Sequence, residues 1–191
     1  MGLRFHHVPD GIFDSGGTTA NITEARKVAE AILTHARTQP QLSLGVATFS
    51  VNQRRVIQEE VERLRRLNPE AEDFFNRHPS EPFFVKNLEN VQGDERDVIM
   101  ISVGYARGAN SPLSMRFGPL GTEGGERRLN VLISRAKRRC EVFASITDED
   151  IDLARARGKG VFALKLFLQY ARTGRLGRVS SFLRDEVTWR C

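Results

Sequence analysis

Two arginines lie in a glycine-flanked stretch, and an arginine side chain is able to bind phosphate. The stretch is 124–139, GGERRLNVLISRAKRR, and Arg128 and Arg135 lie seven residues apart in it. We predict a helix over this range, which would point both guanidiniums in one direction, at the rim of a core. A guanidinium is planar, permanently charged and able to bind two phosphate oxygens at once. The plain alternative is a surface helix whose arginines face water. The apolar face of the predicted helix consists of Leu129, Leu132, Ile133 and Ala136.

Polar residues beside two predicted strands are further candidates for ligand contact. Thr48 ends an apolar strand, where its hydroxyl would be able to bond a ligand, and Arg54 lies in the first turns of the following helix. A second segment, NLENVQGDERD, contains Gly93, a residue type that lets the backbone approach a ligand closely. Glu95 lies two residues further on. The Glu95 carboxylate would either contact a ligand or pair with a nearby arginine.

These candidates need a scaffold, and the apolar pattern predicts one in which strands and helices alternate. Alternation favours an α/β sandwich with a mostly parallel sheet, in which ligands bind at the carboxyl ends of the strands. Residues 68–82 are expected to form a surface excursion. The predicted strands are 3–8, 42–49, 83–88, 98–103 and 140–146, and the predicted helices are 21–38, 51–67, 124–139 and 160–170.

Three segments in this order resemble motifs of superfamily 1 helicases, in particular the Upf1-like branch. GVATFSVNQR at 45–54 resembles motif IV, NLENVQGDERD at 87–97 resembles motif V, and ERRLNVLISRAKRR at 126–139 resembles motif VI. The resemblance implies the second RecA-like domain of such a helicase. That domain is a three-layer α/β sandwich with a mostly parallel sheet, a P-loop NTPase fold that lacks its own P-loop. We expect it to span 1–172 and to be followed by a C-terminal extension or junction, 173–191.

The resemblance also implies roles for individual residues. Arg135, the arginine of the S-R-A triplet, is expected to reach the γ-phosphate of ATP as the catalytic arginine finger. Arg139 lies outside the triplet and is expected to tolerate replacement. We assign ATP binding to Arg54, Gly93, Glu95, Arg128 and Arg135, and nucleic-acid binding to Thr48, Asn87 and Asn90.

Two features around motif IV refine the resemblance. Asn21, Glu24 and Ala25 match the N-x-x-E-A order of the segment that precedes motif IV in Upf1-like helicases. Phe49 and Ser50, however, stand where the family has Pro-Tyr. An aromatic contact with a base or with adenine would therefore lack its expected side chain.

The sequence lacks the parts of a helicase that hold the nucleotide from the other side. It contains no G-x-x-x-x-G-K-[ST] phosphate loop and no acid pair placed to hold magnesium, whereas phosphoryl transfer needs both of these and the arginine. We therefore expect ATP with Mg²⁺ to bind jointly with the first RecA-like domain of the same protein, which would hold the metal. Single-stranded DNA or RNA is the expected track. The isolated domain is not expected to hydrolyse ATP.

Other classes of protein remain as alternatives. A non-catalytic nucleic-acid-binding RecA-like module would need neither Arg135 nor Glu95. A Rossmann-like enzyme would need G-x-G-x-x-G after its first strand, and the loop DGIFDSGGTT lacks that spacing. The acids at 89–97 would suit a nuclease, but they form no convincing D-x-n-E-x-K pattern on adjacent strands.

Composition agrees with a protein that binds nucleic acid or phosphate. The 191 residues include 29 Lys and Arg against 24 Asp and Glu, a net charge of +5. Cys140 and Cys191 form no CxxC or Cys/His cluster, so we predict neither a zinc site nor a disulfide framework, and we interpret Cys140 as a buried thiol. No leader and no long apolar segment is apparent, so we expect no membrane partner and a cytoplasmic location.

Overall fold

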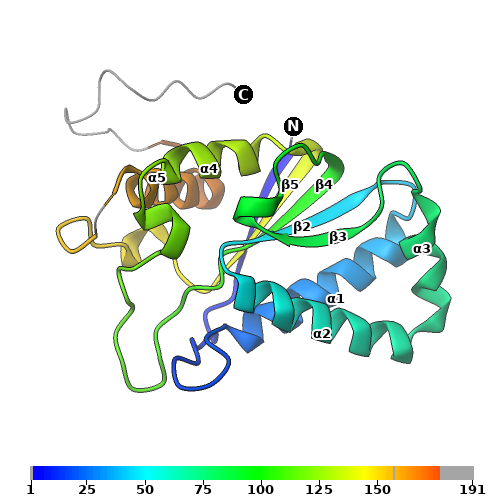
Figure 1. Cartoon of the computed structure of the whole chain (residues 1–191), viewed down its shortest axis with the longest axis horizontal. Helices are drawn as coiled ribbons and strands as arrows, with labels where there is room; N and C mark the ends of the chain where they lie inside the picture. Colours follow the sequence, from blue (N-terminus) through cyan, green and yellow to red (C-terminus); the bar gives the residue numbers. More distant parts are fainter. Residues whose placement is uncertain (1, 157, 177–191) are drawn as a thin grey trace.

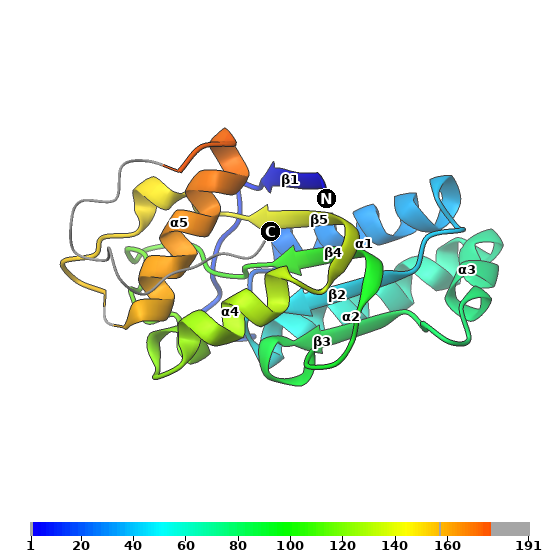
Figure 2. The same ribbon diagram turned by 90° about the horizontal axis from the view of Figure 1, so that it is seen from above.

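The computed structural model describes residues 2–156 and 158–176. They form a five-stranded sheet in which all neighbouring strands run parallel, in the order β1-β5-β4-β2-β3 (Figures 1 and 2). The predicted α/β architecture with a parallel sheet is confirmed. The strands are β1 (Gly2–His7), β2 (Leu44–Thr48), β3 (Phe84–Asn87), β4 (Arg96–Ser102) and β5 (Ala136–Ala144).

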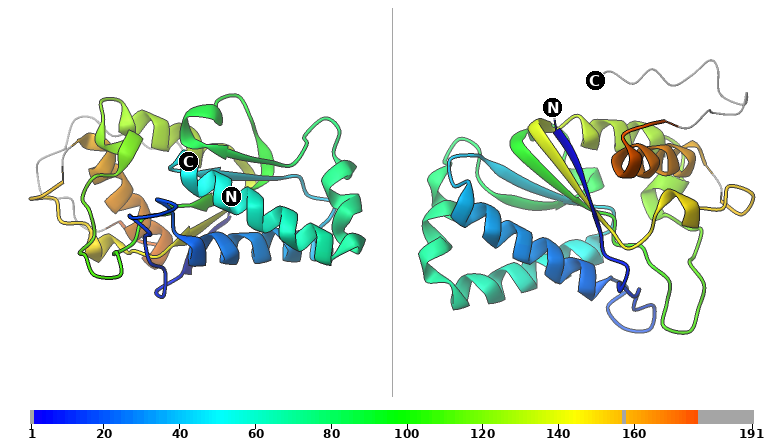
Figure 3. Two further views of the ribbon diagram at one scale, coloured as in Figure 1. Left: turned by 60° about the horizontal axis from the view of Figure 1, so that its bottom comes forward. Right: turned by 180° about the vertical axis from the view of Figure 1, so that it is seen from behind.

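Helices cover both faces of the sheet, which makes three layers. α1 (Ile22–Thr38) and α2 (Val51–Leu67) pack together on one face, and α4 (Gly125–Ile133) and α5 (Lys159–Thr173) pack together on the other (Figures 1 and 3). The short helix α3 (Glu72–Arg77) lies within the predicted surface excursion. This layered arrangement is that of a RecA-like sandwich, as the resemblance implied.

Local sequence explains where α1 and α2 begin, and both helices agree with the predicted ranges. The Asn21 side chain accepts a hydrogen bond from the Glu24 amide at 3.0 Å and caps α1. The Ser50 hydroxyl accepts one from the Gln53 amide at 3.1 Å and caps α2. An apolar face on each helix then packs on the sheet.

The central strands are buried on both faces, as their nearly continuous apolar runs predicted. All five residues of β2 are buried, and alternate residues of β4 and β5 face the two apolar clusters under the helices. Cys140 in β5 is fully buried, which raises the pKa of its thiol to about 12 and confirms the buried thiol that was predicted. Cys191 lies outside the described residues.

The predicted helix over 124–139 is wrong in its second half. α4 ends at Ile133, the chain turns at Ser134 and Arg135, and β5 begins at Ala136. The cause is the sheet, because the Arg96 amide donates to the Arg135 carbonyl at 3.2 Å and the following residues pair with both β4 and β1. Arg135 therefore shares no helix face with the arginines of α4.

The far end of the chain is described only in part. α5 ends at Thr173, and Gly174 after it adopts a left-handed conformation with φ of 69° that stops the helix. The predicted C-terminal extension begins here, but residues 177–191 lie outside the described part of the chain. Among the described helices, none is both long and apolar enough to span a membrane.

Candidate nucleotide and nucleic-acid sites

The carboxyl ends of β2, β3 and β4 bring three polar side chains to one level of the sheet. We call this end of the strands the carboxyl edge and the opposite end the amino edge. Thr48 pairs in register with Asn87 on β3 and with Ser102 on β4. Thr48 is fully buried, and its hydroxyl donates to the Ser50 carbonyl at 2.8 Å. The predicted phosphate contact by Thr48 would therefore require this hydroxyl to leave its present partner.

Asn87 and Asn90 are better placed to meet a ligand at this edge. The Asn87 side chain is buried, and its Oδ1 atom has no hydrogen-bond partner among residues 2–156 and 158–176. Such a group carries a desolvation cost that a ligand atom would offset. Asn90 follows at the end of a short 3-10 turn and is exposed. The two predicted nucleic-acid contacts thus combine an unpaired buried amide with a surface amide.

Arg54 is half-buried in the first turn and a half of α2, the helix that packs beneath β3. Its Nε atom is buried without a partner. Within the described residues, its guanidinium makes no hydrogen bond or ion pair. An arginine held by its backbone and not by a protein partner is suited to receive an anionic ligand.

The segment that joins β3 to β4 contains the predicted motif V and packs over the face of the sheet that α4 covers, where Leu88 and Val91 join the apolar cluster (Figure 2). Its path is fixed by an ion pair between Lys86 Nζ in β3 and Asp94 Oδ2 at 2.6 Å. Gly93 has φ of 89°, a conformation that side chains rarely adopt, although a Cβ atom there would meet nothing within 4 Å. Backbone conformation, and not crowding, therefore explains the glycine.

Glu95 and Arg135 meet at the amino ends of β4 and β5. Arg135 Nη1 lies 3.4 Å from Glu95 Oε1, and Arg135 Nε donates to the carbonyl of Val131 in the last turn of α4 at 3.0 Å. The Arg135 side chain is 21% exposed, and the Glu95 side chain is 52% exposed. The pairing of Glu95 with an arginine, raised above as an alternative, does occur, and the arginine is the predicted finger.

Arg128 has a different environment from Arg135. Its Nη1 atom donates to the carbonyls of Pro119 and Glu123, at 3.2 and 2.9 Å, and lies 3.2 Å from the Thr122 hydroxyl. The guanidinium therefore closes the turn that leads into α4. The structure does not bring Arg128 beside the guanidinium of Arg135, contrary to the shared helix direction that was predicted.

The predicted site residues divide between two opposite edges of the sheet. β4 runs from Arg96, beside Glu95, to Ser102, level with Thr48 and Asn87. Six residues of strand span roughly 20 Å. The predicted nucleic-acid contacts lie at the carboxyl edge, as does Arg54 in the first turn of α2, whereas Glu95 and Arg135 lie at the amino edge. The expectation that ligands gather at the carboxyl ends is therefore corrected for these two residues.

The departure from the family pattern in motif IV has a structural explanation. Phe49 is only 1% exposed and packs in the core, with its ring centroid 6.3 Å from that of Tyr105. Ser50 caps α2. Neither residue presents an aromatic ring to a ligand.

A buried polar network at the carboxyl edge was not predicted, although the N-x-x-E-A order had singled out Glu24. Glu24 is fully buried in the first turn of α1, and the donors around it come from the ends of β4 and β5. Burial raises the pKa of the Glu24 carboxyl to about 7, against hydrogen bonds that lower it. Apart from Asn21, three residues before it, its partners are 78 to 121 residues away in sequence, so spacing alone could not reveal them.

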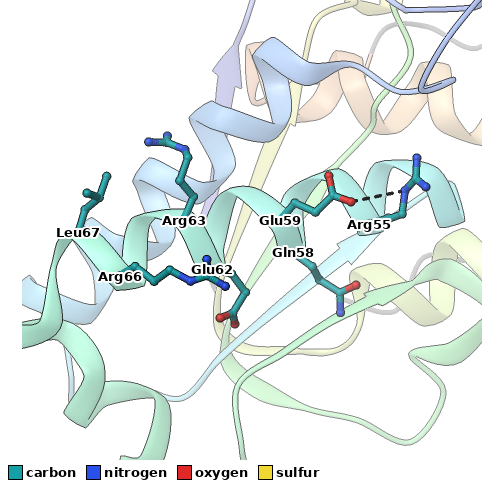
Figure 4. Close-up of a pocket in the computed structure, with 7 residues that line it drawn as sticks. All are labelled: Arg55, Gln58, Glu59, Glu62, Arg63, Arg66 and Leu67. Carbon is teal, nitrogen blue, oxygen red and sulfur yellow. Dashed lines mark ion pairs between the residues drawn. The ribbon is translucent and has the colours of Figure 1, made fainter.

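A shallow hollow of about 640 Å³ on the outer face of α2 is separate from these residues (Figure 4). Acidic and basic side chains line it and pair with one another, as Arg55 Nε does with Glu59 Oε1 at 3.8 Å. It is a solvated helix face. Its lining residues are Arg55, Gln58, Glu59, Glu62, Arg63, Arg66 and Leu67.

The fold and the two edges define a RecA-like domain with candidate contacts for nucleotide and for nucleic acid. Residues 4–147 match the family model described as AAA domain. The chain belongs to this family, which corresponds to the C-terminal region of superfamily 1 helicases, and the predicted resemblance is confirmed.

Two relatives carry the name of a helicase. The chain is 38% identical over 170 residues to the uncharacterized ATP-dependent helicase MG140 of Mycoplasma genitalium, and equally to its homolog in Mycoplasma pneumoniae. The match covers 86% of this chain and 14% of each relative. The chain therefore spans a small part of the length of the relatives it matches.

Proposed function

We propose that this chain is the C-terminal motor domain of an ATP-dependent superfamily 1 helicase or translocase of the Upf1-like branch. The observation that carries the proposal is the placement of Arg135, whose partner at 3.4 Å is the half-exposed carboxylate of Glu95. An ion pair of this kind contributes little to stability. A phosphate group, which has more charge and more acceptor oxygens, would replace Glu95 as the partner.

In this proposal the nucleotide lies between two RecA-like domains, and this chain supplies one side. We assign Arg135 to the phosphates from the amino ends of β4 and β5, where the loop with Gly93 and Glu95 borders the nucleotide. We assign Arg54 to the phosphates from the first turn of α2, which follows the carboxyl end of β2. Arg135 acts as the finger that neutralises charge as it develops on the transferred group. Arg128 would act indirectly, by fixing the start of α4.

Magnesium bound with ATP would offset phosphate charge from the other side of the nucleotide. The described residues contain no group of three or more His, Cys, Asp or Glu side chains that could hold a metal ion. We therefore assign the Mg²⁺ ligands and the phosphate loop to the first RecA-like domain. Residues 1–172 would form the second domain, in a protein that we place in the cytoplasm.

Single-stranded nucleic acid would lie along the carboxyl edge. The Nδ2 groups of Asn87 and Asn90 would donate to phosphate oxygens, which carry no sequence information. The unpaired Oδ1 of Asn87 is an acceptor and would take a donor such as a sugar hydroxyl. β4 connects this edge to the amino edge. A domain movement driven by the nucleotide would therefore also shift the bound nucleic acid. The alternative is a non-catalytic nucleic-acid-binding module. Arg135 and Glu95 favour the motor, because such a module has no use for them.

The isolated chain is expected to show no ATP hydrolysis, because it supplies only half of the nucleotide site. Phosphate release by the purified chain, with and without single-stranded nucleic acid, is the measurement. The intact parent protein, prepared in the same way, should hydrolyse ATP. Steady release that persists through further purification of the isolated chain would contradict the proposed division between two domains.

The isolated chain is expected to bind single-stranded DNA or RNA weakly, with a shallow dependence on salt, because it offers only part of the track. Replacing Asn87 with alanine should weaken binding by about 2- to 10-fold, the range of one hydrogen bond. Fluorescence anisotropy with a labelled oligonucleotide measures both. Asn76→Ala on α3, an exposed asparagine outside the proposed track, is the control. Tight binding that ignores salt, or equal effects of the two replacements, would count against the track.

A further inference from the structure

The buried carboxylate of Glu24 is the centre of a hydrogen-bond network that the proposed function has not used. Glu24 Oε1 accepts from the Ser102 hydroxyl and from the Gly104 amide, each at 2.7 Å. Glu24 Oε2 accepts from the Ser145 amide and hydroxyl, each at 3.1 Å. One side chain of α1 therefore fixes the chain just after β4 and just after β5.

Ser102 connects this carboxylate to α2. Its hydroxyl donates to Glu24 and accepts from Gln53 Nε2 at 3.1 Å. The side-chain amide of Gln53 also bonds twice to the backbone of Asn21. Its Oε1 atom accepts from the Asn21 backbone N–H at 2.8 Å, and its Nε2 atom donates to the Asn21 carbonyl at 3.1 Å. Gln53 is fully buried and is held on both sides.

Gln53 immediately precedes Arg54, whose guanidinium has no hydrogen-bond or ion-pair partner in the part of the chain that the structure describes. The position of the Arg54 guanidinium therefore depends on how firmly the first turns of α2 are held. The Ser50 hydroxyl caps that turn by accepting from the backbone N–H of Gln53. The Gln53 side chain joins the turn to the sheet by its hydrogen bond to Ser102. A ligand-binding arginine without a supporting contact needs its backbone fixed in this way.

We propose that Glu24 is a positioning residue for nucleotide hydrolysis, which acts through Ser102 and Gln53 to fix Arg54. The inference rests on the proposed function, because it assigns Arg54 to the nucleotide phosphates. The path is short and buried, and each link is a hydrogen bond between fully buried side chains.

Two serines at the ends of β4 and β5 offer a matched test. The hydroxyls of Ser102 and Ser145 each donate to Glu24, and each accepts one hydrogen bond from an amide side chain, from Gln53 at 3.1 Å and from Asn21 at 2.7 Å. Ser102 bonds directly to Gln53, the residue beside Arg54, whereas Ser145 bonds to the Asn21 side chain and reaches Gln53 only through the Asn21 backbone. Both changes to alanine remove one hydroxyl. Glu24→Gln is less suitable as a test, because the N–H groups of the new side-chain amide would face the N–H and O–H donors that now bond the carboxylate.

In the intact parent protein, Ser102→Ala is expected to lower the kcat of ATP hydrolysis roughly tenfold, since a small displacement of a phosphate-binding group is costly. Ser145→Ala should leave kcat unchanged. Both variants should show similarly small falls in melting temperature. Equal losses of kcat in the two variants, or none in Ser102→Ala, would overturn the inference.

Combining each change with Arg54→Ala separates positioning from general damage. If Ser102 acts through Arg54, Ser102→Ala should cause no further loss once Arg54 is absent. An undiminished further loss would show that Ser102 acts elsewhere and would overturn the inference. The proposed function fails independently if Arg54→Ala and Arg135→Ala each hydrolyse ATP at the parent rate.

Discussion

In the intact parent protein, Arg135→Ala is expected to lower ATP hydrolysis by about 10³- to 10⁵-fold, the usual contribution of an arginine finger to phosphoryl transfer. The alanine leaves the developing negative charge on the phosphoryl group without its partner from this side of the nucleotide. Single-turnover hydrolysis, compared with ATP binding by the same protein, measures the loss at the chemical step. Nucleic-acid binding should be largely kept, because Arg135 lies at the other edge of the sheet.

The fold should tolerate this change. Arg135 gives up one hydrogen bond, from Nε to the Val131 carbonyl at 3.0 Å, and one weak pair with Glu95 at 3.4 Å. Together these contribute about 1 kcal/mol to the free energy of unfolding, so the melting temperature should move little. A large fall in melting temperature would instead identify Arg135 as a structural residue.

Arg127 provides the control for Arg135. It belongs to the same motif on α4, its side chain is 88% exposed, and its nearest acid is Glu126 at 4.0 Å. Arg127→Ala removes the same charge from the same region and should hydrolyse ATP at nearly the parent rate. If Arg135→Ala also kept the parent rate, the assignment of the finger would be wrong.

Those elements whose signals are local could be predicted from the sequence. α2 occupies 51–67 as predicted, because Ser50 caps it and its apolar residues repeat at helical spacing. β2 was recognised because a strand buried on both faces needs a continuous apolar run. The order of the three motifs then indicated the fold, and the family match confirmed it.

The end of α4 could not be predicted in this way. The apolar spacing of the motif continues through Ala136, yet that residue begins β5 because β4 and β1 offer hydrogen bonds on both sides. Helical periodicity carries no information about a strand that arrives from elsewhere in the chain. The same limit hid the network of Glu24, whose distant partners follow β4 and β5.

The candidate site was predicted as a set of residues but not as an arrangement. Glu95 and Arg135 are 40 residues apart in sequence, and only the pairing of β4 with β5 brings them together. The pattern also could not show that the Thr48 hydroxyl is already used by Ser50. Asn87, by contrast, has a buried oxygen with no partner. Residue types were sufficient to nominate contacts, whereas their availability depends on packing.

Arg139 is a second case in which position in the fold overrides position in the motif. It was expected to tolerate replacement, but it lies in β5 with its side chain 16% exposed. Its Nε atom lies 2.6 Å from Glu141 Oε1, and its Nη2 atom donates to Gln39 at 2.9 Å. His6 lies 2.8 Å from the other oxygen of Glu141. The structure therefore makes Arg139 part of a largely buried cluster, and its use as a neutral control is ruled out.

We expect Arg139→Ala to lower the free energy of unfolding by about 2–4 kcal/mol, because it leaves a buried carboxylate with one partner fewer. Burial opposes ionisation of Glu141, but hydrogen bonds and charges from His6 and Arg139 outweigh it and lower the pKa of this carboxyl to about 2. A lowered pKa stabilises the fold above the ordinary value near 4.5, and this stabilisation is lost as pH falls through 2. The difference between parent and variant should therefore be full at pH 7 and should shrink below pH 4.5.

Chemical unfolding of the isolated chain at several pH values measures this difference, and the neighbouring residue supplies the control. Arg138 points to the opposite face of β5, is 68% exposed and pairs with Asp97 at 3.1 Å. Arg138→Ala should cost less than about 1 kcal/mol, the range of an exposed pair. Equal costs for the two arginines, or a cost for Arg139 that does not change with pH, would contradict the role of the cluster. Arg135 and Arg139 lie four residues apart in one motif, yet the first should change hydrolysis without unfolding and the second should change stability.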